Sequence, residues 1–243
     1  MLMRPFILFT WFFLSVVSRQ LIAQTPVKQA APLAPKQQSI VLISALTAKG
    51  DLQKLPAALT VGLDAGLTIS EIKEVLVHLY AYCGFPRSIR GLQTFMALLD
   101  ERKKKGITDL VGKEASPITS TDSKYERGKK ILGTLTGQPQ TGRLRGYSAF
   151  SPEIDTFLKE HLFADIFERD VLSYADRELT TISVLTAIGE VEPMLQSHLG
   201  ICLHLGLSES QLKQAIALIG TRVSQTDGDA GQAVLAQVMT SRR

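Results

Sequence analysis

The sequence predicts an all-α protein made of two copies of one helical unit. Apolar residues recur at spacings of three and four along most of the 243 residues, and no segment shows the alternation typical of a half-buried strand. Residues 43–50 (ISALTAKG) and 182–189 (ISVLTAIG) agree at six of eight positions. Such self-similarity indicates an internal repeat.

The similarity continues beyond these two segments. After a one-residue slip, eight residues of the first copy meet identical residues of the second. They are Leu55, Leu59, Leu63, Gly66, Leu67, Ser70, Lys73 and Gly91, which match Leu195, Leu199, Leu203, Gly206, Leu207, Ser210, Lys213 and Gly231. Each copy is therefore expected to have three helices separated by two breaks, the second break being Gly-Leu-Thr or Gly-Leu-Ser.

The first copy is predicted over residues 40–106. Thr68 or Ser70 caps a helix in this copy, and Gly84 with Pro86 is expected to end it. A further helix follows over residues 88–105 and is closed by a glycine at position 106.

Residues 107–122 contain Gly112, Pro117 and several Ser and Thr residues and are predicted to link the two halves. The second domain, residues 123–243, opens with an additional helix around 125–135. A Gly-rich loop at 137–146 and an amphipathic segment at 152–168 precede the second copy of the unit.

The amino terminus has the pattern of a secretory signal peptide over residues 1–23. Arg4 precedes an apolar run of 12 residues, which Arg19 interrupts soon afterwards. A membrane-spanning helix needs roughly 20 apolar residues, so a permanent anchor is not expected. Residues 24–39 are predicted to be a flexible leader, and the mature protein is predicted to be exported, to a periplasm, without membrane contact.

Composition excludes several classes of protein. A chain that is 45% hydrophobic and 21% charged is neither disordered nor collagen-like, and two cysteines cannot make a disulfide scaffold. Without residues 1–23, which hold two arginines and no acid, the net charge falls from +4 to +2. No basic cluster is interleaved with aromatic residues, so a nucleic-acid partner is not expected.

Residues 65–86 (AGLTISEIKEVLVHLYAYCGFP) resemble the central motif of the carboxymuconolactone decarboxylase-like family, which includes the alkyl hydroperoxidase D-like fold. The second half resembles the same family in several short segments. These are residues 125–128, 163–172 and 176–189, His198-Leu199 and Gly206-Leu207. The resemblance implies helical subunits joined in trimers or hexamers with sites at subunit contacts, so a trimer of two-repeat chains is expected. The family includes cofactor-independent lactone decarboxylases and thiol peroxidases.

His78 and Tyr82 each fall within about 20° of Glu71 on a helical wheel, with Glu74 about 60° to one side. A carboxylate and an imidazole at the edge of an apolar face can exchange a proton with a substrate. A structural interpretation fits as well, because Glu71 and Glu74 favour the helix start and His78 suits a subunit contact. The spacing leaves both interpretations open.

Cys83 lies 12 residues after Glu71, which is the spacing of glutamate and first cysteine in the peroxidase motif. The second cysteine of that motif would fall at Pro86 and its histidine at Arg90, so an outside thiol would have to resolve an oxidised Cys83. The alternative is a small buried thiol. Cys202 has Gly62 as its repeat counterpart, and a disulfide with Cys83 is left open.

His198 and Cys202 share a helix face, but no third ligand sits at a suitable spacing, so no metal is expected. His198 matches the His-Leu element of the family and has Ala58 as its counterpart in the first copy. In the second copy, a neutral residue or Arg replaces each titratable member of this stripe. At the positions of Glu71, Glu74, His78, Tyr82 and Cys83 it has Gln211, Gln214, Leu218, Arg222 and Val223. A single site is therefore predicted, combining the stripe of one copy with His198 of the other, within or between chains.

The combined prediction is a cofactor-independent acid/base enzyme of the decarboxylase or lactone type acting on a small organic acid. Glu71 and His78 form the acid/base pair, His198 is an auxiliary proton donor, and Tyr82 and Cys83 line the pocket. The substrate carboxylate is assigned to two arginines after the Gly-Phe-Pro turn. They are Arg87 and Arg90. A peroxidase using Cys83 and a non-catalytic helical binding or assembly protein are the alternatives.

Overall fold

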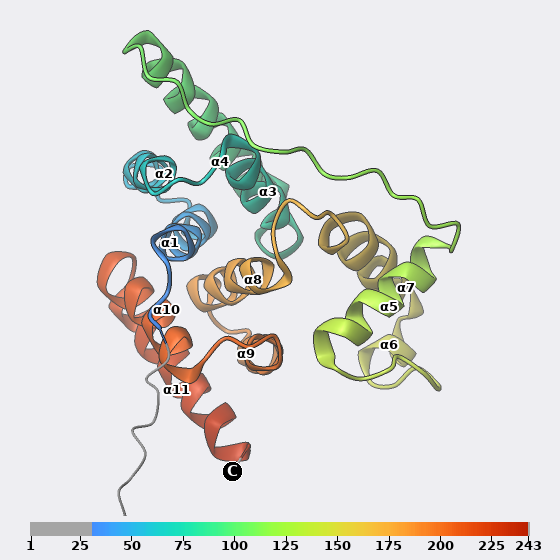
Figure 1. Cartoon of the computed structure of the whole chain (residues 1–243). Helices are drawn as coiled ribbons and strands as arrows, with labels where there is room; N and C mark the ends of the chain where they lie inside the picture. The colour runs from blue at the N-terminus through green and yellow to red at the C-terminus, as the bar shows by residue number, and fades with distance from the viewer. Residues whose placement is uncertain (1–30, 243) are drawn as a thin grey trace, which may run out of the picture.

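The computed structural model describes residues 31–242, and every regular element within that range is a helix (Figure 1). The helices are α1 (Pro35–Lys49), α2 (Leu55–Asp64), α3 (Ile69–His78), α4 (Tyr80–Lys104), α5 (Lys124–Thr136), α6 (Tyr147–Phe150), α7 (Pro152–Thr156), the π-helix η1 (Phe157–Phe167), α8 (Tyr174–Ile188), α9 (Glu192–His204), α10 (Glu209–Arg222) and α11 (Gln225–Ser241). The predicted signal peptide lies outside the described residues. Over residues 31–242, no helix combines the length and the apolar character that a bilayer crossing requires.

The two copies of the repeat are α1–α4 and α8–α11, and they share one hydrophobic core. Helices α1 and α8, which carry the matching ISxLTAxG segments, pack against each other at the centre of the molecule (Figure 1). Each central helix also contacts the third helix of the opposite copy, α1 against α10 and α8 against α3. The prediction of an all-α fold with two repeats is confirmed.

The predicted leader at 24–39 extends too far. Helix α1 begins at Pro35, and Leu33 before it is only 1% exposed. Proline suits the first turn of a helix because the amide it lacks would have no helical partner there. The predicted leader, which was inferred from composition, therefore includes the first residues of α1.

The predicted helix end at Gly84 and Pro86 coincides with a break in helical geometry, because α4 consists of two helical segments that meet in a kink at Gly84. Thr68 caps α3, which ends at His78, and α4 starts at Tyr80 and continues past both residues to Lys104. Gly84 has φ +79° and ψ 161°, a conformation that residues with a side chain rarely adopt. The break therefore changes the direction of the chain and keeps the first turn of α4 beside α3.

Helices α5 and η1 form an additional pair that precedes the second copy. Gly128 allows their close approach, because a Cβ at this position would lie 1.8 Å from the carbonyl oxygen of Lys159. Their contact is a second apolar cluster that includes Leu135, Phe163 and Phe167. The segment 107–122 runs in extended form from α4 to α5 (Figure 1).

Candidate functional site

Ionisable side chains of both copies meet at the junction where the end of α3 and the start of α4 face α8 and α9. We call this group the junction cluster. Its members are Glu74, His78, Tyr82, Arg177, Glu178, Thr181 and His198. Most of them are fully or almost fully buried in a chain whose other charged groups lie mainly at the surface.

His78, the last residue of α3, is completely buried, and the hydrogen bonds of its ring define its tautomer. Its Nδ1 lies 3.4 Å from Nη1 of Arg177, and its Nε2 lies 2.9 Å from Oγ1 of Thr181. Arginine has only donors, so Nδ1 accepts and Nε2 carries the proton that it donates to Thr181. Burial, followed by the charge of Arg177, lowers the pKa of His78 well below its usual value. His78 is therefore a neutral, fixed ring.

Glu74 is held by two arginines from the second half of the chain. Nη2 of Arg177 donates to its Oε1 at 2.7 Å, and Nε of Arg169 donates to the same oxygen at 2.8 Å. Arg177 also donates to the carbonyl oxygen of Arg169 at 2.6 Å. A buried carboxylate needs such partners, because an unpaired charge in a protein interior is strongly destabilising. This network joins α3 to α8.

Glu178 and His198 form a carboxylate–imidazole pair between α8 and α9. Oε2 of Glu178 lies 2.8 Å from Nδ1 of His198. The carboxylate is fully buried, whereas the His198 side chain is 16% exposed. Within residues 31–242, Nε2 of His198 has no hydrogen-bond partner. The pair thus has a buried carboxylate that orients the ring and a second ring nitrogen without a hydrogen-bond partner in the described chain.

Tyr82 connects the two histidines of the cluster. Its ring stacks on His78 with centroids 5.4 Å apart and meets the ring of His198 edge-on at 6.0 Å. Its hydroxyl lies 3.2 Å from Oγ1 of Thr181. Burial, followed by the negative charge of Glu178, raises the pKa of Tyr82, so its phenol stays protonated at neutral pH.

Two buried atoms of the cluster have no hydrogen-bond partner in the described part of the chain. They are Nε of Arg177 and Oε1 of Glu178. Most buried polar groups in proteins are paired, so an unpaired donor and an unpaired acceptor on adjacent residues need an explanation. Strain, ordered water and a bound ligand are the usual ones, and all three are common at functional sites.

The structure brings together three of the residues predicted for the site: His78, Tyr82 and His198. Glu71 is elsewhere, because its carboxylate accepts from the Thr68 amide at 2.7 Å in a capping box and lies 3.4 Å from Lys36. The next acidic residue, Glu74, occupies the position beside His78 instead.

The predicted arginines do not reach the junction cluster. Arg87 and Arg90 are exposed on α4, where Arg90 donates to Gln93 at 2.8 Å. Arg177 is the arginine that the fold delivers to His78. Its position follows from the packing of α8 against α3, which spacing within the first copy does not reveal.

Both cysteines are free thiols. Cys83 donates to the carbonyl oxygen of Leu79, and burial raises its pKa to about 11. Cys202 is fully buried one turn after His198, and burial together with the charge of Glu178 raises its pKa well above the usual value. Neither sulfur is a thiolate at neutral pH, the form that a reactive cysteine requires.

The internal repeat supplies a comparison within the same chain. The pseudo-equivalent junction, between α10 and α1, has neither carboxylates nor histidines at the matching positions, and Arg222 is the one ionisable residue among them. The residues there are Gln38, Ser39, Leu42, Ala58, Gln214, Leu218 and Arg222, in place of Arg177, Glu178, Thr181, His198, Glu74, His78 and Tyr82. Both junctions are compatible with the fold, so the fold alone does not require the carboxylate–histidine pair.

Sequence reasoning had not selected Arg177, Glu178 or Thr181. The available signal was the repeat itself. Arg177 and Glu178 are adjacent charged residues at the start of a largely buried helix, where the first copy has the neutral pair Gln38 and Ser39. This difference between the two central helices marks Arg177 and Glu178 in the sequence.

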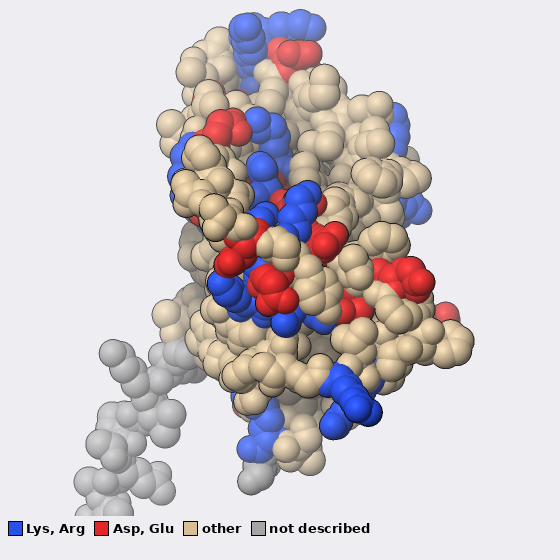
Figure 2. All heavy atoms as spheres, turned by 90° about the vertical axis from the view of Figure 1, so that its right-hand side faces the viewer, with Lys and Arg blue, Asp and Glu red and all other residues tan. Residues whose placement is uncertain are grey.

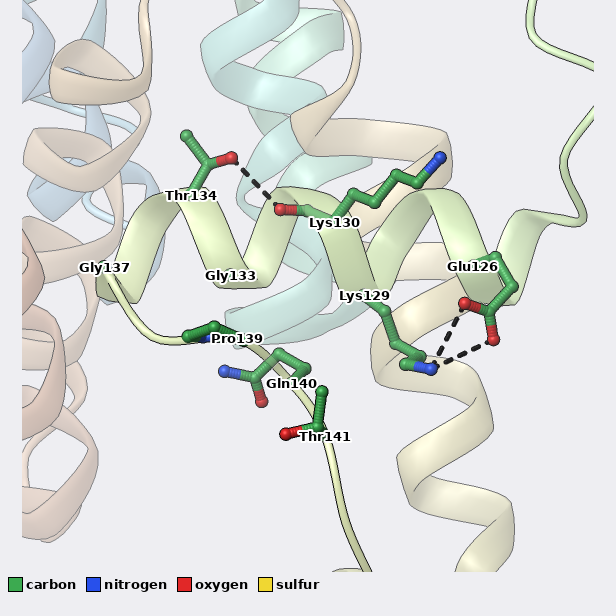
Figure 3. A pocket seen from close by; sticks show the side chains of 9 residues that line it. All are labelled: Glu126, Lys129, Lys130, Gly133, Thr134, Gly137, Pro139, Gln140 and Thr141. Carbon is green, nitrogen blue, oxygen red and sulfur yellow. Dashed lines mark hydrogen bonds and ion pairs between the residues drawn. The ribbon is translucent and has the colours of Figure 1, made fainter.

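Four surface hollows in the described chain have no member of the junction cluster in their linings. One of about 640 Å³ lies between α5 and the loop that follows it, with Lys129 paired to Glu126 at one end (Figure 3). Its lining contains no histidine or cysteine. Within the cluster, Tyr82 and His198 are the members that are partly exposed.

The Carboxymuconolactone decarboxylase family model matches residues 23–95 and 152–235, one match in each half and more than half of the chain together. The chain belongs to this family. It is similar to the 4-carboxymuconolactone decarboxylase of Acinetobacter baylyi (strain ATCC 33305 / BD413 / ADP1), with 27% identity over 96 residues, which are 39% of this chain and 71% of the relative.

Proposed function

We propose that this protein is a cofactor-independent acid/base enzyme of the decarboxylase or lactone type, with Glu178 and His198 as its reactive pair. The observation that carries the proposal is the 2.8 Å contact between a buried carboxylate and a histidine whose other nitrogen is unoccupied in the described chain. The relative from Acinetobacter baylyi bears a name that specifies decarboxylation of a carboxylated lactone. A small organic acid is therefore the proposed substrate class.

In the proposed reaction, the bond between the substrate carboxylate and its neighbouring carbon breaks, and carbon dioxide leaves. The electron pair delocalises into an adjacent carbonyl, and the carbon then takes a proton from Nε2 of His198, which is afterwards replaced from water. Glu178 keeps the ring in place and offsets its positive charge before the transfer. Tyr82 packs edge-on against the His198 ring and is itself stacked on His78. This changes the predicted roles, since Glu71 serves as a cap.

The test uses two substitutions and a matched control. His198→Asn removes the proton-transfer group and should lower kcat for carbon dioxide release from carboxylated lactones by about 10²- to 10⁴-fold. Glu178→Gln should lower kcat while the variant stays folded. His204→Asn changes an exposed histidine on the same helix and should leave kcat unchanged. Full activity in His198→Asn, or no wild-type turnover of any lactone or small organic acid, contradicts the proposal.

The peroxidase alternative depends on Cys83. With a pKa of about 11, roughly one Cys83 in ten thousand is a thiolate at pH 7, so peroxide should react slowly. A dimedone-type probe for sulfenic acid should label Cys83 weakly at pH 7. Rapid peroxide-dependent labelling, abolished in Cys83→Ser, would favour the peroxidase instead.

The non-catalytic alternative gains support from the deep burial of Glu74, His78 and Arg177. These residues have an obvious structural task in joining α3 to α8. The exposed edge of His198 and the loss of the equivalent residues at the other junction favour catalysis. The His198→Asn assay separates the two, because a purely structural cluster has no activity to lose.

Export and assembly as a trimer of two-repeat chains belong to the same proposal. The pattern of residues 1–23 supports export. Large exposed apolar side chains on α4, such as Phe85 at 63% and Met96 at 65%, support a subunit contact. The amino-terminal sequence of the secreted protein and its native mass would test these two points.

A further inference from the structure

The loop between α5 and α6 covers a polar hollow that lies away from the junction cluster. The hollow has a volume of about 460 Å³, within the usual range for small-molecule sites. Its wall is the loop, and its floor is formed by α7 and η1. The lining residues with charged side chains are Arg143, Arg145, Asp155 and Lys159.

The floor is a neutral ion pair. Nζ of Lys159 lies 2.6 Å from Oδ2 of Asp155, and Tyr125 donates its hydroxyl to the same oxygen at 2.7 Å. Both members of the pair are less than a tenth exposed. Burial opposes the charged form of Asp155, but hydrogen bonds from Lys159, Tyr125 and Ser148 outweigh it and lower the pKa of this carboxyl. The Asp155 carboxylate therefore stays charged, and it is paired with groups of the protein itself.

The two arginines of the wall are uncompensated. Arg143 and Arg145 take part in no ion pair or side-chain hydrogen bond with any described residue. Elsewhere on this side of the molecule, basic and acidic side chains alternate, as Figure 2 shows over the middle of the face. Arg127 with Glu168 and Lys124 with Asp165 are examples.

The lining therefore carries three cations and one anion, a net charge of +2. Guanidinium groups bind carboxylate and phosphate oxygens with two parallel hydrogen bonds. Gly142 and Gly146, both with positive φ, turn the backbone on either side of these arginines. Gln140 and Thr141 add polar groups at one edge, where the hollow of Figure 3 adjoins this one.

We propose that this hollow binds a doubly charged oxyanion, either a phosphate group or a small dicarboxylate, through Arg143 and Arg145. Two positive charges without partners match the charge of such a ligand. The site is independent of the acid/base proposal, because none of its residues belongs to the junction cluster.

The test is a calorimetric titration of the full-length protein with inorganic phosphate, succinate and acetate at low salt. Phosphate, succinate or both should bind more tightly than acetate. Binding of phosphate alone would identify a phosphate site, and binding of succinate alone a dicarboxylate site. The double substitution Arg143→Gln with Arg145→Gln should weaken binding at least about 10-fold.

A matched control removes the same charge elsewhere. Lys103→Gln with Lys104→Gln neutralises two exposed cations at the end of α4 and should leave the affinity unchanged. Equal loss in both double variants would show non-specific attraction and overturn the proposal. Unchanged affinity in the arginine variant, or no binding of either dianion by wild type at about 10 mM, would also overturn it.

Discussion

Arg177→Met should destabilise the protein strongly, because Arg177 is a buried member of an ion pair. The side chain is 0% exposed and donates to Glu74 at 2.7 Å and to the Arg169 carbonyl oxygen at 2.6 Å. Breaking a buried ion pair costs about 3–5 kcal/mol, since the remaining charge stays desolvated. Glu74 keeps Arg169, so the lower end, about 3 kcal/mol, applies. For a chain of this length that lowers Tm by roughly 6–12 °C.

Thermal unfolding followed by circular dichroism measures the effect, and a second variant measures its cause. Arg169→Met removes the partner that is 40% exposed and should cost about 1 kcal/mol. Adding Glu74→Gln to Arg177→Met removes the stranded charge and should restore part of the loss. If the double variant is no more stable than Arg177→Met alone, or if Arg177→Met unfolds within about 1 °C of wild type, the ion-pair reasoning is wrong.

Two further predictions concern stability. Because burial keeps His78 neutral, the unfolded chain gains a proton near pH 6.5 that the folded chain does not, so the free energy of unfolding should fall by up to about 1.4 kcal/mol per pH unit below 6.5. Urea titrations from pH 7 to 5 should show a shallower pH dependence in His78→Gln, and equal slopes would refute this. Gly128→Ala places a Cβ 1.8 Å from the Lys159 carbonyl oxygen and should lower the free energy of unfolding by about 1–3 kcal/mol or more. In Gly133→Ala the new Cβ lies 3.4 Å from its nearest neighbour, so this variant should be neutral or stabilising. Similar melting temperatures for the two variants would contradict the close-packing argument.

Much of the fold could be predicted because repeats and helix signals are local. The shared segments at 43–50 and 182–189 located the two central helices, and Thr68 marked the start of α3. Local signals were less reliable where tertiary contacts decide. Pro35 begins a helix within the predicted leader, since Leu33 beside it is anchored in the core. At Gly84 helical geometry breaks as predicted, and a second helical segment of α4 follows directly after the kink.

The candidate site was predicted only in part. Spacing placed His78 and Tyr82 on one face, and comparison of the copies pointed to His198. Spacing could not distinguish Glu71 from Glu74, because both lie near that face and the choice depends on whether a carboxylate meets a helix amide or an arginine of another helix.

The sequence by itself determined the helical repeat, the family and the imbalance between the two copies, since these depend on residue identity and periodicity along the chain. Only the tertiary structure decided that Glu178 orients His198, that Arg177 anchors Glu74, and that Arg143 and Arg145 face a hollow without partners. The physical reason is that a charge in a protein interior is defined by its neighbours. The partners of Arg177, for example, lie about a hundred residues away on α3, and packing alone brings them within hydrogen-bond distance.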